Sequence, residues 1–117
     1  MRALLLLLLL SPGLSLAGEE SAGREVAFGL KVAQKGLWQE ARFRFERAVQ
    51  LDPGNAAAHN DLAVALEQMG EFAEARKAYE KALELKPGDI YIQQNYDLFR
   101  EADDKRNRKS RRKRTQP

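Results

Sequence analysis

The chain contains three stretches that differ in how apolar and polar residues follow one another. An uninterrupted apolar run, Ala3 to Leu10, lies near the start. Between about residues 18 and 104, apolar residues recur at spacings of three and four, the pattern of helices that bury one face. Residues 105–117 are almost wholly polar. The pattern predicts one helical domain between two segments that do not belong to its core.

The middle stretch repeats itself with a period of 34 residues. Residues 22–55 and 56–89 share eleven identical positions, which include a glycine at the same place in each unit and a Pro-Gly pair near the end. Glycine can take the left-handed conformation that ends a helix, and proline stops the next helix. Each unit is therefore expected to form two helices joined by a turn.

Three residues suited to capping a helix N-terminus also stand 34 positions apart. They are Ser21, Asn55 and Asp89, whose side-chain oxygens can accept hydrogen bonds from free backbone N–H groups. The third start predicts an unpaired helix over about residues 90–104. Its apolar stripe is expected to cover the second unit, and consists of Ile90, Ile92, Tyr96 and Phe99.

The two units resemble the tetratricopeptide repeat family, whose 34-residue pattern alternates large and small apolar residues before a final proline. The first unit matches at Phe28-Gly29, Val32, Ala41, Phe45, Ala48 and Pro53, and the second at Leu62-Ala63, Leu66, Ala75, Tyr79, Ala82 and Pro87. Both depart at the family's tryptophan position, which holds Glu25 and His59. The resemblance implies an all-α fold with two helix-turn-helix repeats and a capping helix, a short right-handed α-solenoid.

The first segment has the order of a secretory signal peptide. Arg2 is followed by the eight-residue apolar run, the helix breaker Pro12-Gly13, and small residues at Ser15 and Ala17. A membrane-spanning helix needs about 20 apolar residues, so this run is too short to be one. We expect cleavage after Ala17 and an exported protein in the periplasm or outside the cell. A buried apolar N-terminal element is the alternative.

Charge is strongly segregated along the chain. All 17 acidic residues lie between Glu19 and Asp104, while the run Lys105 to Arg114 holds eight of the 20 basic ones. With that run and Arg2 set aside, 11 basic residues face 17 acidic ones, a net charge of −6. Because like charges in series repel, residues 105–117 are predicted to be disordered.

The basic run offers a second function, binding to an anionic lipid surface or a polyanion. The residues expected to bind the anion are Lys105, Arg106, Arg108, Lys109, Arg111, Arg112, Lys113 and Arg114. A competing expectation is that this tail lies on the acidic body and covers its binding face.

The sequence offers little for catalysis or metal binding. Without cysteine there is no disulfide and no thiolate metal site, and His59 is the single histidine. Phosphate-binding loops, nucleophile motifs and metal-ligand spacings are missing from the printed sequence. We therefore expect no enzyme activity, no cofactor and no metal.

Protein binding is the function that the resemblance implies, on the concave face formed by the first helices of successive units. The positions expected to face a partner there are Val26, Leu30, Asn60, Val64, Glu67, Tyr91, Gln94, Leu98 and Glu101. Some relatives hold a peptide's terminal carboxylate with Lys, Arg and Asn, but here Asp61 and apolar residues occupy most of those positions. An apolar floor with acidic flanks favours an apolar or basic peptide.

A second surface is suggested by two aromatic residues in the first unit. Trp38 and Phe43 stand at the N-terminal edge of the repeats, and Phe43 replaces a lysine of the second unit. We expect them either to cover this edge or to contact a partner, which could be a second copy in a homodimer.

Overall fold

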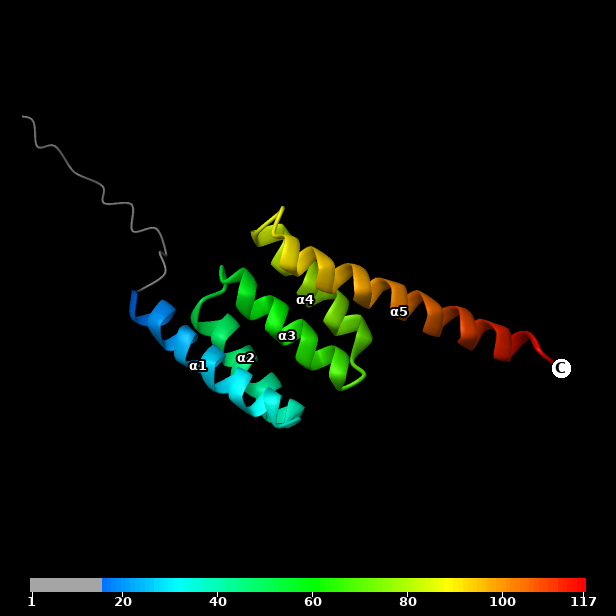
Figure 1. Cartoon of the computed structure of the whole chain (residues 1–117), viewed down its shortest axis with the longest axis horizontal. Coiled ribbons are helices and arrows are strands. Elements are labelled where there is room, and N and C mark those ends of the chain that lie inside the picture. Colours follow the sequence, from blue (N-terminus) through cyan, green and yellow to red (C-terminus); the bar gives the residue numbers. More distant parts are fainter. Residues whose placement is uncertain (1–15) are drawn as a thin grey trace, which may run out of the picture.

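The computed structural model describes residues 16–117, so the predicted signal segment lies almost entirely outside the described residues. Five helices follow in order: α1 Leu16–Gln34, α2 Trp38–Leu51, α3 Ala56–Gln68, α4 Phe72–Leu85 and α5 Ile90–Thr115. Helices α1 and α2 form one pair, α3 and α4 the next, and α5 packs on the second pair (Figure 1). The predicted all-α solenoid of two helix pairs and a further helix is confirmed.

The first helix of each unit ends in the same way. Gly36 and Gly70 have φ angles of +75° and +78°, in the left-handed region that favours glycine. Beyond each glycine, a backbone N–H bonds back across the turn, from Leu37 to Val32 at 3.0 Å and from Glu71 to Leu66 at 2.9 Å. This arrangement satisfies carbonyls at the helix end and reverses the chain into the second helix.

Two of the three predicted helix starts are confirmed. The side chain of Asn55 accepts a hydrogen bond from the Ala58 N–H, and that of Asp89 from the Ile92 N–H, each at 3.0 Å. The third start, Ser21, is wrong because α1 begins at Leu16. The extra helical turn packs on the end of α2, where a Cβ at Gly18 would lie 2.9 Å from the Leu51 carbonyl oxygen.

The core lies between successive helices rather than at one centre. One cluster joins α1, α2 and α3 around Phe45, and another joins α3, α4 and α5 around Tyr79. Both aromatic side chains are buried. The helices approach closely beside them: a Cβ at Gly29 would come within 2.5 Å of the Phe45 ring.

The 34-residue register shows how the stack ends at α1. Ala58 and Ala65 of α3 are buried, and so are Ile92 and Phe99 at the same two positions of α5. The matching residues of α1 are Arg24 and Lys31, which are exposed. In α3 and α5 these positions pack against the preceding unit. In α1 they hold charged residues on the outer side of the stack.

Helix α5 corrects two expectations for the C-terminal part of the chain. Ile90 was expected to pack on the second unit, but it is 73% exposed. The helix was expected to end near residue 104 and a disordered tail to follow, but α5 continues to Thr115. Asp104 stands where α1 and α3 are followed by glycine, so no turn interrupts the helix. We call residues 105–115 the basic rod.

Side chains at the base of the basic rod bind it to α4. Asp103 is buried and accepts hydrogen bonds from Arg76 at 2.8 Å and from Arg106 at 3.2 Å. The Arg106 guanidinium also lies 3.5 Å from the centre of the Phe72 ring. Beyond this point the rod projects away from the other helices (Figure 1). Among residues 16–117, no helix has both the length and the apolar character required to cross a membrane.

Candidate functional site

The first helices of the two units and α5 meet around one hollow. It has a volume of about 220 Å³ and is lined by Leu30, Ala33 and Gln34 of α1, Trp38 and Phe45 of α2, Asp61 and Val64 of α3, and Tyr91 of α5. We call this hollow, together with the neighbouring exposed face of α5, the groove. Three of the predicted partner-facing residues, Leu30, Val64 and Tyr91, are thus brought together in it.

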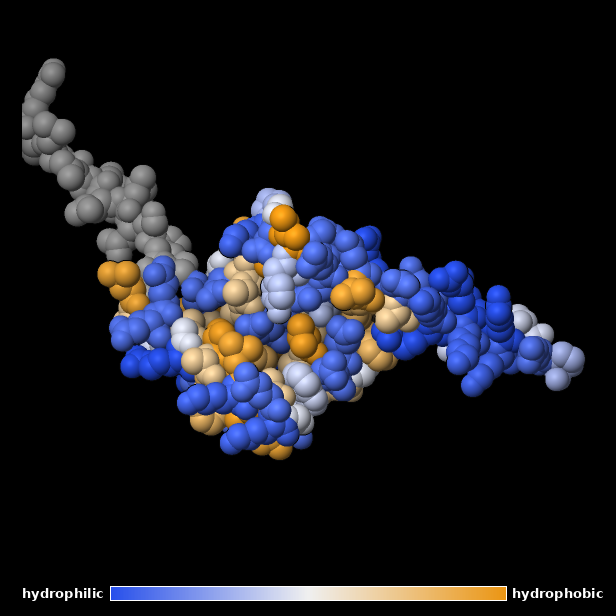
Figure 2. All heavy atoms as spheres, viewed as in Figure 1, coloured by the Kyte–Doolittle hydropathy of each residue, from blue (hydrophilic) through white to orange (hydrophobic). Residues whose placement is uncertain are grey.

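The groove exposes apolar side chains to solvent. Leu30 is 44% exposed, Tyr91 66% and Leu98 67%, all large residues for which burial would be favourable. Figure 2 shows hydrophobic atoms gathered over α1 and α3 on this face, while the projecting end of α5 is almost wholly hydrophilic. Val26 and Val64 are half-buried, and each packs against a core cluster, so they form part of the floor.

The polar residues predicted to face a partner differ in how accessible they are. Asn60 is 2% exposed, and its Oδ1 accepts a hydrogen bond from Asn95 Nδ2 at 3.2 Å. The expectation that it faces a partner is therefore wrong, because this bond joins α3 to α5 below the surface. Glu67 is half-buried and accepts from the Tyr79 hydroxyl at 2.9 Å. Gln94 and Glu101 are exposed, and Glu101 pairs with Lys105 at 2.9 Å.

Asp61 is the carboxylate that lines the hollow, and it was not among the residues predicted to bind a partner. Burial raises the pKa of its carboxyl group from 3.8 to about 6, and a hydrogen bond with the Asn60 side chain opposes the shift only in part. Within residues 16–117 no Lys or Arg nitrogen comes within 4.0 Å of it. Asp61 is therefore a negative charge with poor solvation, beside apolar side chains, that a cation from outside could neutralise.

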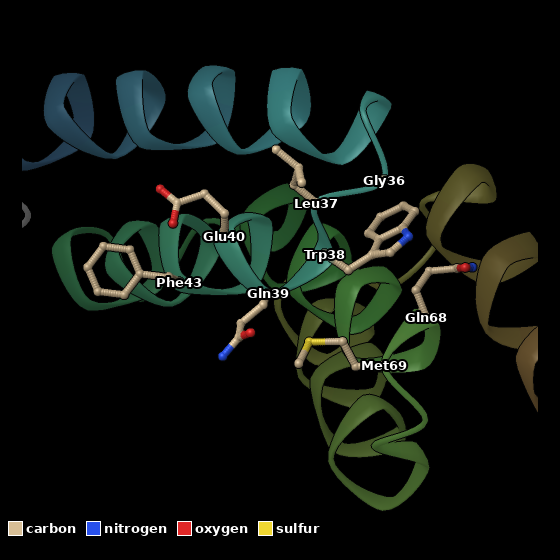
Figure 3. Close-up of a pocket in the computed structure, with 8 residues that line it drawn as sticks. All are labelled: Gly36, Leu37, Trp38, Gln39, Glu40, Phe43, Gln68 and Met69. Atoms are coloured by element: carbon tan, nitrogen blue, oxygen red, sulfur yellow. The ribbon is translucent and has the colours of Figure 1, made fainter.

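Trp38 also lines the hollow, although the sequence pattern did not assign it to this face. Its side chain is half-buried against the cluster of α1, α2 and α3, so the expectation that it stands at the N-terminal edge is wrong. It also lines a second hollow. That hollow, which we call the edge hollow, has a volume of about 890 Å³ (Figure 3). It is lined by Gly36, Leu37, Trp38, Gln39, Glu40, Phe43, Gln68 and Met69.

Two aromatic residues of the first unit, Phe28 and Phe43, are in contact with an arginine of the same helix pair. The Arg44 guanidinium lies 4.3 Å from the centre of the Phe28 ring and 5.5 Å from that of Phe43. It also pairs with Glu25 at 3.4 Å and with Glu40 at 3.1 Å. Phe43 therefore has a charged group beside it, and both Phe43 and Leu37 stay about half exposed.

The cations of the basic rod fall into two groups. Lys105 pairs with Glu101, and Arg106 pairs with Asp103 and stacks on Phe72, so these two residues hold the rod to the body. The other six have no carboxylate partner in the part of the chain that the structure describes, and are Arg108, Lys109, Arg111, Arg112, Lys113 and Arg114. Arg106 therefore has a packing role at the base of the rod, and its predicted anion contact stays a prediction.

The other candidates for chemistry are explained by local structure. His59 Nε2 lies 2.9 Å from the Pro53 carbonyl oxygen, a contact that joins the start of α3 to the preceding loop. Within residues 16–117, no three His, Cys, Asp or Glu side chains are grouped so that they could hold a metal ion.

Comparisons with known proteins agree with the helical repeat. Residues 33–94, more than half of the chain, match the family model described as tetratricopeptide repeat. A comparison with curated proteins gives no match. The matched residues contain α2, α3 and α4 together with the turn at Gly36 and the start of α5.

Proposed function

The chain belongs to the tetratricopeptide repeat family, and on that premise we propose that it is a non-catalytic adaptor of the cell envelope or secretory space. Repeats of this family generally mediate contacts between proteins. The adaptor binds a peptide segment of another protein in the groove, and this segment combines apolar residues with a basic one.

The observation that carries this proposal is the composition of the hollow between α1, α3 and α5. Leu30, Val64 and Tyr91 offer apolar surface, and burying it would contribute about 25 cal/mol for each Å² removed from water. Asp61 places beside them a negative charge that no Lys or Arg of residues 16–117 neutralises. A lysine or arginine flanked by apolar residues would match both features, because its stem can pack on the walls while its head meets the carboxylate.

Selection from a random peptide library displayed on phage tests the proposal without a known partner. We expect the full chain to enrich peptides that carry a basic residue among apolar ones. Replacing Leu30 and Leu98 together with serine should abolish their binding, and these exposed positions leave the core intact. The matched control is Leu37→Ser with Phe43→Ser, which removes equally exposed side chains from the edge hollow. If the control variant loses peptide binding while the groove variant keeps it, the groove is not the binding site.

Location outside the cytoplasm is a separate part of the proposal. It is supported by Arg2, the apolar run from Ala3 to Leu10, and the small residues before Gly18. N-terminal sequencing of the protein from its native cells should give Gly18 as the first residue. An intact chain that begins at Met1 and stays in the membrane fraction would replace the exported adaptor with an anchored one.

A second candidate function is favoured by the six cations of the basic rod that have no carboxylate partner among residues 16–117. The rod has no apolar face, so it cannot lie in a bilayer as an amphipathic helix does, and any contact with lipid or polyanion is electrostatic. Such binding would depend steeply on salt and be unselective. Binding of the full chain to anionic vesicles that survives the loss of Arg108 to Arg114 would contradict it.

A further inference from the structure

One side of α5 is continuous between the groove and the basic rod. The groove residues of this helix, Tyr91, Gln94, Leu98 and Glu101, follow one another at spacings of three and four, and so lie on one side. The same spacing continues beyond Glu101 to Lys105, Arg108 and Arg112. About five helical turns separate Tyr91 from Lys109, which therefore lies on this side too. A chain leaving the groove along α5 would meet these cations next.

These four cations form a common surface, which we call the basic stripe. Lys105, Arg108, Lys109 and Arg112 line one hollow of about 290 Å³. Lys105 pairs with Glu101 at the boundary with the groove, whereas the other three have no carboxylate partner within residues 16–117. Neighbouring cations at these spacings repel one another, so an anionic group bound between them would relieve the repulsion.

The base of the rod keeps the basic stripe aligned with the groove. Arg106 is stacked on Phe72 of α4, and Asp103 is bonded to both Arg106 and Arg76. The rod points away from the other helices (Figure 1), so the chain's own tail does not lie over its groove. The tail of a second copy does not fit either, since it is basic and lacks apolar residues for the groove floor.

We infer that the partner segment is bipartite: a basic residue among apolar ones occupies the groove, and an adjoining acidic tract lies along the basic stripe. The inference rests on the proposed function and adds the chemistry of the part outside the groove. The charges of the partner would thus complement those of the chain. Its basic residue would lie beside Asp61, and its acidic residues beside Arg108 and Arg112.

Two labelled peptides test the inference on the full chain. Both begin with Leu-Leu-Arg-Leu-Leu; one continues with a run of glutamates and the other with a run of serines of equal length. At low salt, fluorescence anisotropy should show that the glutamate peptide binds about tenfold more tightly than the serine peptide. In R108Q/R112Q this advantage should be lost. R111Q/R114Q removes the same charge from other sides of the helix and should change it less than about twofold.

The outcomes separate the inference from the proposed function. Equal loss in the two double variants would mean unselective polyanion binding by the whole rod, and would overturn the bipartite partner. Equal affinity for the two peptides would overturn it as well while leaving the groove in place. If neither peptide binds, or if serine-peptide binding survives Leu30→Ser with Leu98→Ser, the groove itself fails.

Discussion

The guanidinium of Arg106 lies 3.5 Å from the centre of the Phe72 ring and joins the base of the basic rod to the start of α4. Arg106→Gln removes this stacking and the ion pair with Asp103. Because the cations beyond it repel one another, we expect the end of α5 to fray back towards residue 104. Amide hydrogen exchange would report it as faster exchange in residues 105–112.

Arg114→Gln is the control for this prediction, since it changes the same charge without touching Phe72. It should leave exchange in residues 105–110 unaltered. If Arg106→Gln leaves the exchange rates of the rod at their wild-type values, the contact with α4 does not hold the rod in place.

Two glycines of α1 are expected to respond in opposite ways to alanine. No atom of the described residues lies within 4 Å of a Cβ at Gly23, so Gly23→Ala should stabilise the protein by about 0.5–1 kcal/mol through helix propensity. A Cβ at Gly29 would meet the buried Phe45 ring at 2.5 Å, so Gly29→Ala should destabilise it by about 1–3 kcal/mol. Urea unfolding measures both; a stabilising Gly29→Ala would show that α1 and α2 are less closely packed.

The structure of the repeats was predictable wherever it depends on neighbouring residues. The turns at Gly36 and Gly70, and the caps at Asn55 and Asp89, are set by a few adjacent residues and appear directly in the sequence. The extent of α5 was not predictable in this way. It depends on contacts that Asp103 and Arg106 make with residues of α4, about 30 positions earlier in the chain.

The candidate groove was predictable in outline, because the family pattern indicates which side of each first helix faces the concave surface. Its details depend on distant partners. Asn60 is buried and accepts a hydrogen bond from Asn95 of α5, and Trp38 reaches the groove from α2. The role of Asp61 depends on the apolar residues around it. Leu30, Val64 and Tyr91 come from three different helices, and only the fold brings them to Asp61.

Stability should depend on pH through Asp61. Its pKa rises from 3.8 to about 6 on folding, so between these values the folded state binds more protons than the unfolded state. The contribution of Asp61 to the free energy of unfolding should therefore fall as pH rises through this window, and the loss is complete above it. Asp61→Asn should remove this contribution and stabilise the protein at pH 7.5 by about 1–3 kcal/mol.

Urea unfolding at pH 4 and pH 7.5 measures this effect, with the wild-type protein and Asp61→Asn compared at each value. The gain from Asp61→Asn should be much smaller at pH 4, below about 1 kcal/mol, because the carboxyl group of the folded state is then protonated. A gain of equal size at both pH values would mean that the carboxyl group titrates normally.

The rod should bind single-stranded polyanions with the salt dependence of six cations. Lys105 and Arg106 are held by Glu101 and Asp103, so about six contacts remain and the logarithmic salt slope should be about −4. Titration of labelled oligothymidine at several salt concentrations gives the slope. A value near −6 would mean that all eight cations engage and that the contacts at the base of the rod open.

The central claim is that the groove between α1, α3 and α5 binds the partner peptide. Its most direct test is a map of backbone NMR shifts on the full chain as the Leu-Leu-Arg-Leu-Leu peptide with the serine run is added. We predict the largest changes at Leu30, Asp61, Val64 and Tyr91, which line the hollow. Changes concentrated at Leu37, Phe43 and Met69 of the edge hollow, with the groove signals unmoved, would contradict the claim.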